Sequence, residues 1–208
     1  MNTRRLIVVR HAETAWNRER RYQGQTDIPL SPEGEADVLK LRARLQRRAD
    51  LFDHDKTAVL SSDLLRAKRT AELLLGAPGR DIFYDASFRE FNYGVFEGLS
   101  RDEIVERYPQ EFERWTRDED EHYAPPRAES RFAVRQRVEA GLDRWLQQLT
   151  HRTLVIVTHG GVLRQFLRKV REHSVGDAYD MPTQINYGNL AVHLIEIREG
   201  IWGYAGNL

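Results

Sequence analysis

The sequence predicts an α/β fold with a mainly parallel central sheet and helices on both faces of that sheet. Three short runs are apolar without alternation, at 6–9, at 154–157 and at 57–60, where the apolar residues follow Thr57. Continuous apolar runs are typical of strands that are buried on both faces, as in parallel sheets. Between these runs, apolar residues recur at helical spacing. Buried strands that alternate with amphipathic helices favour a parallel sheet with two helical layers.

The first half of the chain supplies two helices of this pattern. After the first strand, Ser31 and Pro32 are typical of an N-cap followed by the first residue of a helix. The strand at 57–60 leads into a second helix, which we expect Ser61 or Ser62 to cap. The apolar stripes of these two helices consist of Val38, Leu41 and Leu45, and of Leu64, Ala67, Ala71 and Leu74.

The second half continues the pattern. A short strand is expected at 82–84, Ser130 can cap a long helix, and a further helix follows the strand at 154–157. Residues 190–197 alternate less cleanly, and we expect an edge strand there. The apolar stripe of the long helix consists of Val138, Leu142, Trp145 and Leu149.

Residues 95–129 interrupt the alternation of strands and helices. They hold short helical pieces and a polar stretch at 118–126. We interpret them as a lid-like insertion over the sheet rather than as a separate domain. The sequence shows no internal repeat and no long linker, so we expect residues 1–208 to form a single domain.

Composition excludes several classes of protein. Basic and acidic residues balance at 32 each, which argues against generic binding to nucleic acid or to a membrane surface. The chain has no cysteine, which excludes disulfides, thiolate nucleophiles and cysteine-ligated metals. The apolar run at 6–9 is too short for a signal-peptide core or a membrane span. We therefore expect a soluble cytoplasmic protein.

Two histidines directly follow predicted parallel strands. His11 follows the first strand and His159 follows the strand at 154–157. Ligands of open parallel sheets bind beyond the carboxyl ends of the strands, so both side chains fall on the functional edge. Gly160 and Gly161 allow close backbone approach at a helix N-terminus, which attracts anions. Arg66, in the first turn of another helix, belongs to the same edge.

Arg10, Arg66, His11 and His159 together predict a phosphate pocket. Guanidinium groups can neutralise phosphoryl oxygens directly, so we expect no metal. A neutral His11 can attack phosphorus in line, and the nearby positive charge disfavours protonation of its imidazole.

The alkoxide that leaves needs a proton donor. Glu90, which comes shortly after the strand at 82–84, is the favoured candidate. Glu13, only two residues from His11, is the competitor. A general acid typically contributes ~10²–10⁴-fold to the rate.

One further motif suggests a different chemistry and is rejected. Asp53-His54-Asp55-Lys56-Thr57 matches the D-x-D-x-T pattern of magnesium-dependent phosphatases of the haloacid dehalogenase type. That chemistry needs the first Asp at the end of a buried strand, whereas polar residues precede Asp53. We expect a loop there. Among the remaining histidines, only His122 stays open as a functional residue, because it falls in the lid.

Motifs spread in order over nearly the whole chain form one pattern. They are Arg10-His11-Ala12-Glu13-Thr14, Trp16-Asn17, Tyr22-Gln23-Gly24, Ser61-Ser62-Asp63-Leu64 with Arg66-Ala67, Arg89-Glu90, Tyr93-Gly94, Glu97-Gly98 and Thr158-His159-Gly160-Gly161. Together they closely resemble the histidine phosphatase superfamily, which includes cofactor-dependent phosphoglycerate mutase, fructose-2,6-bisphosphatase and alpha-ribazole phosphatase. The resemblance is to its phosphatase branch and implies a phosphoglycerate mutase-like fold with a helical insertion over the active site.

The resemblance also implies roles for individual residues. His11 would be the phosphorylated nucleophile and Glu90 the acid and then the base. The residues implied to bind the phosphate and the substrate are Arg10, Arg66, His159, Asn17, Gln23, Gly24, Tyr93 and Gly160. It implies no cofactor, and a small phosphate ester as partner rather than nucleic acid or membrane, with a homodimer left open. Ala12 departs from the pattern, because Gly is usual at that position.

A phosphomonoester hydrolase is the predicted function, with a cofactor-dependent phosphoglycerate mutase as the alternative and an inactive phospho-ligand-binding module as the third. Mutases of this family usually carry Trp where this chain has Gln25, a basic lid where it has the acidic run 118–121, and longer chains. Carboxylates beside a trianionic ligand cost affinity. Basic residues offset that run only partly, namely Arg114, Arg117 and Arg127. Tyr93 and residues 123–126 do resemble mutase features.

Overall fold

A computed structural model describes residues 3–48, 51, 53, 56–75, 81–117, 119–174 and 184–208. Over these residues the chain forms one six-stranded sheet with the strand order β3-β2-β4-β1-β5-β6. The strands are β1 (Thr3–Arg10), β2 (Thr57–Ser61), β3 (Ile82–Tyr84), β4 (Thr153–Thr158), β5 (Val192–Arg198) and β6 (Ile201–Asn207). Strands β3, β2, β4 and β1 are parallel to their neighbours, whereas β5 is antiparallel to β1 and β6 to β5. The prediction of a mainly parallel sheet is confirmed.

The C-terminal part of the sheet differs from the expectation. The strand expected near 190–197 is present as β5, but it does not lie at the edge, because it pairs with β1 on one side and with β6 on the other. The edge is formed by β6, which the apolar pattern did not reveal. Its sequence, IWGYAGN, carries two glycines and lacks a continuous apolar run.

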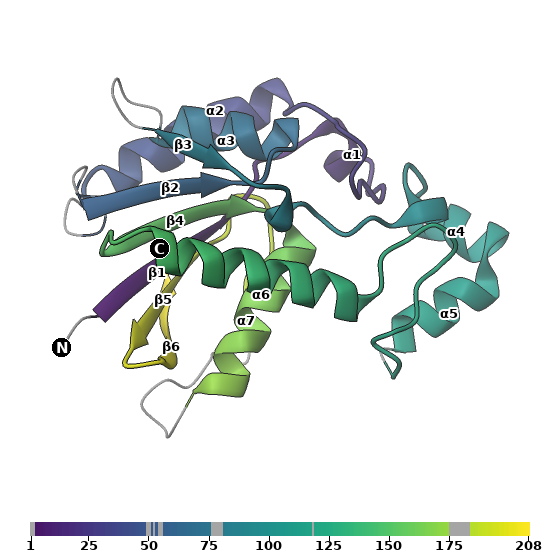
Figure 1. Cartoon of the computed structure of the whole chain (residues 1–208). Coiled ribbons are helices and arrows are strands. Elements are labelled where there is room, and N and C mark those ends of the chain that lie inside the picture. The colour runs from purple at the N-terminus through teal and green to yellow at the C-terminus, as the bar shows by residue number, and fades with distance from the viewer. Residues whose placement is uncertain are drawn as a thin grey trace.

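Helices cover both faces of the sheet, as predicted (Figure 1). The pair α2 (Pro32–Leu45) and α3 (Leu65–Leu75) lies on one face, and the pair α6 (Arg131–Gln148) and α7 (Gly160–His173) lies on the other. Because successive strand side chains point to opposite faces, Ile7 and Val9 pack with the first pair and Leu6 and Val8 with the second. Each strand is therefore buried on both faces, which is why its sequence is continuously apolar.

The predicted helix starts are present. Ser31 accepts a hydrogen bond from Gly34 N at the start of α2, where Pro32 is the first helical residue. Ser130 accepts one from Ala133 N at the start of α6. Near the start of α3, Ser62 Oγ accepts a hydrogen bond from Leu64 N at 3.3 Å, one residue before the helix. The first helical N–H, of Leu65, donates instead to Asp27 Oδ1 at 2.7 Å, so the predicted cap by Ser61 or Ser62 is not seen on a helical N–H.

The insertion contains η3 (Gly94–Phe96), α4 (Arg101–Arg107) and α5 (Pro109–Arg117), preceded by η2 (Ala86–Phe88). Figure 1 shows α4 and α5, together with α1 (Ala15–Arg18), on the side to which the arrowheads of β2 and β4 point. The apolar residues of the insertion, which include Ile104, Phe112 and Trp115, join the cluster beneath α6 and α7. The insertion thus packs onto the main core beside the carboxyl edge of the sheet.

Two further observations concern the predictions above. No helix among the described residues combines the length and the apolar character that a membrane span requires. Asp53 and Lys56 of the rejected D-x-D-x-T motif form an exposed ion pair at 2.7 Å ahead of β2, and the two residues between them lie outside the described residues. Asp53 therefore precedes a buried strand rather than ending one, as expected.

Candidate active site

A pocket of about 260 Å³ lies beyond the carboxyl end of β1 and brings most of the predicted site residues together. Its walls come from the ends of β1 and η2, from the start of α3 and from the loop after α1. The lining residues are Arg10, His11, Asn17, Arg20, Arg21, Tyr22, Gln23, Gly24, Arg66, Glu90 and Tyr93. Segments that are far apart in the sequence therefore converge on one concave site.

The His11 ring is oriented by a hydrogen bond to the backbone of the next residue, Ala12. Its Nδ1 lies 2.7 Å from the Ala12 carbonyl oxygen, and a carbonyl can only accept, so Nδ1 carries the proton. Burial lowers the pKa of His11 well below its ordinary value, and the positive charges of Arg66 and Arg10 lower it further. The imidazole is therefore neutral at pH 7, with a lone pair on Nε2.

Arg66 is fully buried at the floor of the site. Its two terminal nitrogens donate to the carbonyl oxygens of Gly24 and Thr26, at 2.6 and 3.0 Å. Burial lowers the pKa of Arg66 to about 10, and the carboxylate of Glu90 opposes this shift, so the guanidinium remains charged at pH 7. Its Nε is buried without a hydrogen-bond partner among the described residues. A buried, charged and unsatisfied donor is well suited to an anionic ligand.

Arg10 has a similar environment. One terminal nitrogen donates to the Tyr187 carbonyl oxygen, and its Nε is also buried without a partner among the described residues. The guanidinium packs against Gly160, where an added Cβ would lie 3.4 Å from its Cζ and Nε. Two guanidinium groups therefore stand in the region of His11, each with hydrogen-bond donors left over.

The loop that holds Arg66 is itself held by Glu97. The Glu97 carboxylate accepts hydrogen bonds from the backbone N–H groups of Gln25, Thr26 and Tyr93, at 3.0, 2.9 and 3.0 Å. Gly24 has φ +55°, and a Cβ there would lie 1.9 Å from Glu97 Oε1, so a side chain at this position would displace the carboxylate. The sequence motif contained Glu97, but its spacing gave no sign of this positioning role.

His159 lies behind His11 rather than on the pocket wall. The two rings are 5.1 Å apart between centroids, and His159 Nε2 lies 2.8 Å from Ser62 Oγ. Burial, followed by the charge of Arg66, lowers the pKa of His159 well below its ordinary value. His159 therefore contributes a neutral ring that is fixed by the hydroxyl of Ser62, a partner that sequence reasoning considered only as a helix cap.

Glu90 is placed by the start of α7. Its Oε2 accepts from Gly161 N at 3.0 Å and its Oε1 from Phe91 N at 2.9 Å. The residue is 8% exposed and lines the pocket together with His11. A helix N-terminus favours a carboxylate, and a Cβ at Gly161 would displace this one, since it would lie 2.3 Å from Glu90 Oε1.

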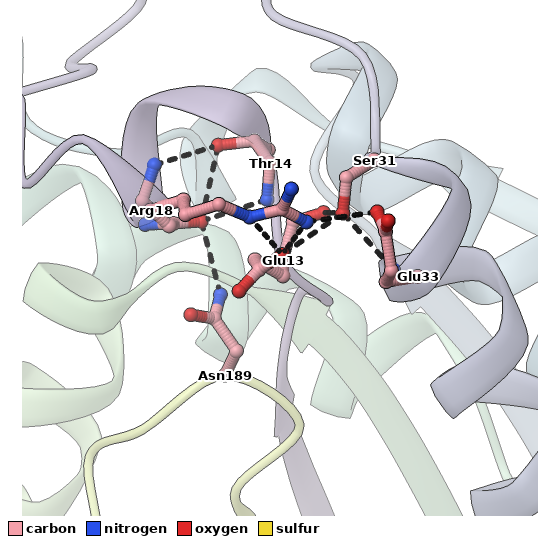
Figure 2. A network of polar contacts seen from close by, with 8 residues as sticks. Glu13, Thr14, Arg18, Ser31, Glu33 and Asn189 are labelled. Carbon is pink, nitrogen blue, oxygen red and sulfur yellow. Dashed lines mark hydrogen bonds and ion pairs between the residues drawn. The ribbon is translucent and has the colours of Figure 1, made fainter.

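Glu13, the competing acid, belongs to a polar network with Arg18, Ser31 and Glu33 (Figure 2). Its Oε1 accepts from Arg18 at 2.7 Å and from Ser31 Oγ at 3.1 Å, while Arg18 also pairs with Glu33. Glu13 does not line the pocket. It instead ties the loop before α1 to the start of α2, so the sequence-based alternative for the acid is not supported by the geometry.

Asn17 is oriented by hydrogen bonds with Thr14 and Asn189. Asn17 Oδ1 accepts from Thr14 N, from Thr14 Oγ1 and from Asn189 Nδ2, each at 3.1 Å. Asn189 also donates to the His11 carbonyl oxygen at 3.1 Å. Since the acceptor side of the Asn17 amide is occupied, its N–H₂ donors are available to the pocket that it lines. Asn189 lies in a stretch where we matched no motif.

A second and larger cavity, of about 800 Å³, adjoins the first. The two share Arg10, Tyr22, Glu90 and Tyr93 among their lining residues. Gly160, predicted to bind substrate, lines this larger cavity rather than the smaller pocket. Burial, and then the negative charge of Glu90, raise the pKa of Tyr93 well above its ordinary value, so its hydroxyl is protonated and can donate.

The described part of the acidic run, residues 119–121, lines neither of these cavities, whereas the sequence-based interpretation placed the run at the mouth of the site. Glu119 and Asp120 line a separate cavity together with Arg114 and Arg117. Asp120 pairs with Arg114 at 2.9 Å. Asp118 lies outside the described residues.

The next two residues of the insertion line neither cavity. Glu121 pairs with Arg135 at 2.9 Å and, at 3.5 Å, with Arg168, which lines the larger cavity. His122 packs on Phe132, with ring centroids 4.4 Å apart, and lines none of the three cavities. Arg127 lines none of them either. Within the part of the chain that the structure describes, no group of three or more histidine or carboxylate side chains is arranged to hold a metal ion.

Comparisons with known proteins agree with this geometry. A relative named probable phosphoglycerate mutase GpmB, from Escherichia coli O1:K1 / APEC, is 30% identical over 204 residues, covering 97% of this chain and 88% of the relative. The solved structure of Bacillus stearothermophilus YhfR is similar with a TM-score of 0.78 and 32% identity, covering 97% of this chain and 95% of that one. The structure of mycobacterial glucosyl-3-phosphoglycerate phosphatase with VO3 is similar with a TM-score of 0.77 and 28% identity. The match covers 97% of this chain and 96% of that one. The model of the histidine phosphatase superfamily (branch 1) matches residues 6–205, and the chain therefore belongs to that superfamily.

Proposed function

We propose that this protein is a phosphomonoester hydrolase that forms a phosphohistidine on His11 Nε2. The observation that carries the proposal is the state of His11 itself. Its proton is on Nδ1, its Nε2 lone pair is free, and its pocket also contains Arg10, Arg66 and Glu90. A neutral nucleophile beside two guanidinium groups fits attack on a dianionic phosphoryl group.

The first step transfers the phosphoryl group to the enzyme. The Nε2 lone pair forms a bond to phosphorus while the bond from phosphorus to the ester oxygen breaks. A proton from solvent must first convert the Glu90 carboxylate to its acid form, which gives that proton to the ester oxygen as the alcohol leaves. Arg10 and Arg66 donate to the phosphoryl oxygens through nitrogens that have no other partner among the described residues.

The second step returns the enzyme to its starting state. Glu90, now a carboxylate, takes a proton from water as the water oxygen bonds to phosphorus and the Nε2–P bond breaks. The products are phosphate and neutral His11. Asn17 and the backbone near Gln23 and Gly24 are proposed to contact the phosphoryl group, because they line the same pocket. His159 is proposed to stabilise its charge from behind His11.

Metal independence is part of the proposal. The two guanidinium groups supply the positive charge that a divalent cation supplies in other phosphatases. Activity on p-nitrophenyl phosphate should therefore survive excess EDTA and gain little from added magnesium. Strict dependence on magnesium would contradict this part of the proposal.

The substrate is proposed to be a small phosphorylated metabolite. One support is the name of a similar solved structure, a phosphatase that acts on glucosyl-3-phosphoglycerate. Another is the size of the adjoining cavity, about 800 Å³, which can hold a leaving group of several carbons.

A rapid-quench experiment tests the intermediate. Mixing the protein with ³²P-labelled substrate should trap an acid-labile phosphoryl group, and His11→Ala should lose both the label and turnover. The matched control is His173→Ala, which removes an exposed histidine at the end of α7. Label that persists in His11→Ala would contradict the assignment, and phosphate binding without any label would favour the inactive phospho-ligand-binding module.

The mutase alternative now has specific observations in its favour. The larger cavity is lined by arginines rather than by the acidic run, and the E. coli relative carries a mutase name. The discriminating measurement supplies 3-phosphoglycerate with catalytic 2,3-bisphosphoglycerate and follows 2-phosphoglycerate and free phosphate. We expect phosphate release to dominate, because the pocket wall reaches solvent at the exposed Arg20. Isomerisation that greatly outruns hydrolysis would promote the mutase.

A further inference from the structure

The larger cavity is the natural place for the leaving group. It shares Arg10, Tyr22, Glu90 and Tyr93 with the phosphate pocket. Glu90, which is proposed to protonate the ester oxygen, lines both spaces, so the scissile bond would lie where they meet. Everything on the alcohol side of that bond then extends into the cavity of about 800 Å³.

The charge of this cavity is strongly one-sided. Glu90 is the only carboxylate residue among the described residues that line it. The basic residues that line it are Arg10, Arg131, Arg164, Arg168 and Arg171. Three of these belong to α7 at spacings of three and four, which places them along one side of the helix. These three arginines are exposed, and a cleft that is lined by charges of one sign attracts ligands of the opposite sign.

Arg164 stands out among these arginines. Carboxylates reach Arg168, which pairs with Glu172 at 2.8 Å and with Glu121 at 3.5 Å. No carboxylate among the described residues pairs with Arg164, whose guanidinium instead stacks on the Tyr187 ring, 4.1 Å from its centroid. Stacking of this kind holds a guanidinium in place while its edge N–H groups remain available.

The position of Arg164 links it to the catalytic residues. It lies in the second turn of α7, one turn after Gly161, whose N–H holds Glu90. Tyr187 contacts both Arg10 and Arg164. Its carbonyl oxygen accepts a hydrogen bond from Arg10, and its ring stacks on the guanidinium of Arg164. Burial lowers the pKa of Arg10, and the charge of Arg164 lowers it further. Arg164 therefore adds a further cation beside Arg10 and Arg66, on the wall of the larger cavity.

We propose that the substrate is a phosphomonoester whose alcohol carries a second anionic group, a carboxylate or a phosphate, and that this group binds Arg164 in the larger cavity. The inference rests on the proposed function, because it places the transferred phosphoryl group against His11. Aromatic side chains line the space between the two anion sites, namely Tyr22, Phe91, Tyr93 and Trp115. They suit an uncharged carbon body between the two charges.

Three substrates with the same six-carbon chain test this inference. They are sorbitol 6-phosphate, whose far end is neutral, 6-phosphogluconate, whose far end is a carboxylate, and sorbitol 1,6-bisphosphate, whose far end is a phosphate. We expect kcat/KM for at least one doubly anionic substrate to exceed that for sorbitol 6-phosphate by about tenfold or more. A preference for 6-phosphogluconate would indicate a site for a carboxylate, and a preference for sorbitol 1,6-bisphosphate a site for a second phosphate.

Substitutions of Arg164 assign this preference to the residue. Arg164→Gln should reduce the ratio of kcat/KM between the anionic and neutral substrates by about tenfold, and Arg164→Lys should restore part of it. Arg152→Gln is the matched control, since Arg152 is exposed just before the amino end of β4 and lines none of the three cavities. A merely structural role for Arg164 would lower kcat/KM for all three substrates alike, which would overturn the inference.

A binding measurement separates this inference from the proposed function. Calorimetric titration of His11→Ala protein with the three compounds needs no turnover, and the doubly anionic compounds should bind more tightly by about tenfold. If p-nitrophenyl phosphate is not hydrolysed by the wild-type protein but this order of affinities holds, the proposed function fails and the second anion site stands. Hydrolysis of p-nitrophenyl phosphate without any anionic preference in rate or binding would overturn the second site alone.

Discussion

His11 illustrates how a buried position fixes the protonation state of one residue. Burial and two arginines lower its pKa well below the ordinary value of about 6.5. Its imidazole should therefore stay neutral as the pH falls through 6.5, with the proton on Nδ1 because of the bond to the Ala12 carbonyl. Nitrogen-15 NMR, with the His11 signal assigned from His11→Ala, should show this tautomer from about pH 7.5 to about pH 5.5.

The urea-unfolded protein is the internal control for this titration, because its histidines should be half protonated near pH 6.5. The sign of the effect on stability follows from the same shift. The unfolded chain binds the proton more readily, so the contribution is fully present above about pH 6.5 and is lost as the pH falls toward the lowered value of the folded state. A folded-state signal that is half protonated at about pH 6.5 would contradict the assigned environment.

Gly161 is a second residue whose role depends on its surroundings, because the space for a side chain there is occupied by Glu90 and Phe91. A Cβ there would lie 2.3 Å from Glu90 Oε1 and 2.6 Å from the Phe91 ring. We expect Gly161→Ala to displace the carboxylate and to lower kcat on alkyl phosphates by at least tenfold, within the range of a lost general acid of about 10²–10⁴-fold. The loss on p-nitrophenyl phosphate should be much smaller, because its leaving group needs little protonation.

The double variant Glu90→Gln/Gly161→Ala provides the control for this prediction. If Gly161 acts through Glu90, the second substitution should add little to the first. Additive losses would show that Gly161 contributes in some other way, for example through the backbone at the start of α7.

At the scale of elements, the loop at 24–26 depends on a single carboxylate. Glu97 accepts three backbone N–H groups, two of them in this loop, and the loop carbonyls in turn hold Arg66. In Glu97→Gln, an amide N–H₂ replaces one acceptor, so at least one partly buried backbone N–H loses its partner. We expect phosphate, used as a competitive inhibitor, to bind about tenfold more weakly. The matched control is Glu72→Gln on the exposed side of α3.

The melting temperature of Glu97→Gln supplies a second readout. A drop in melting temperature together with weaker phosphate inhibition would fit a carboxylate that positions Arg66. If the melting temperature falls while phosphate inhibition is unchanged, Glu97 supports the fold but does not act through Arg66.

Elements with local signals could be predicted from the sequence, whereas their arrangement could not. Ser31 and Ser130 indicate helix starts, because their side chains accept hydrogen bonds from backbone N–H groups three residues later. The order β3-β2-β4-β1-β5-β6 depends on contacts between distant segments, which no local pattern encodes. For the same reason β6 was missed and β5 was expected at the edge. The two strands bury their apolar residues against each other and against α7, so neither needs a continuous apolar run.

The candidate site divides in a similar way. Residues at strand ends, such as His11 and His159, could be predicted because the carboxyl edge of a parallel sheet collects ligands. The position of the acidic run at 118–121 could not be predicted from the sequence, because it depends on how the insertion folds. Arg164 gave no signal either, because an arginine on an exposed helix face is ordinary in sequence and becomes notable only beside a cavity.

At the scale of the whole molecule, the distribution of charge decides what surrounds the substrate. Glu119 and Asp120 line a cavity that shares no lining residue with the phosphate pocket or its larger neighbour. We therefore expect Glu119→Lys to leave the ratio of phosphate release to isomerisation from 3-phosphoglycerate unchanged within about twofold, since exposed charges at a distance are screened. Arg164→Gln provides the contrast, because it should alter that ratio. A change of about tenfold in Glu119→Lys would place the acidic run at the mouth after all.

The central position of β1 has a consequence for biosynthesis. Leu6 pairs with Leu154 on one side and with Ile195 on the other. The strand β1, which is synthesised early, therefore cannot pair until β4 and β5 have been synthesised. At about 5–20 residues per second, the fully buried run Leu6–Val9 would stay unpaired on the ribosome for on the order of ten seconds. Nascent chains stalled before Thr153 should accordingly be cut by added protease and retained by chaperones, while chains stalled with Asn207 clear of the exit tunnel should resist. Protection that already appears before β4 emerges would mean that another segment shields β1 first.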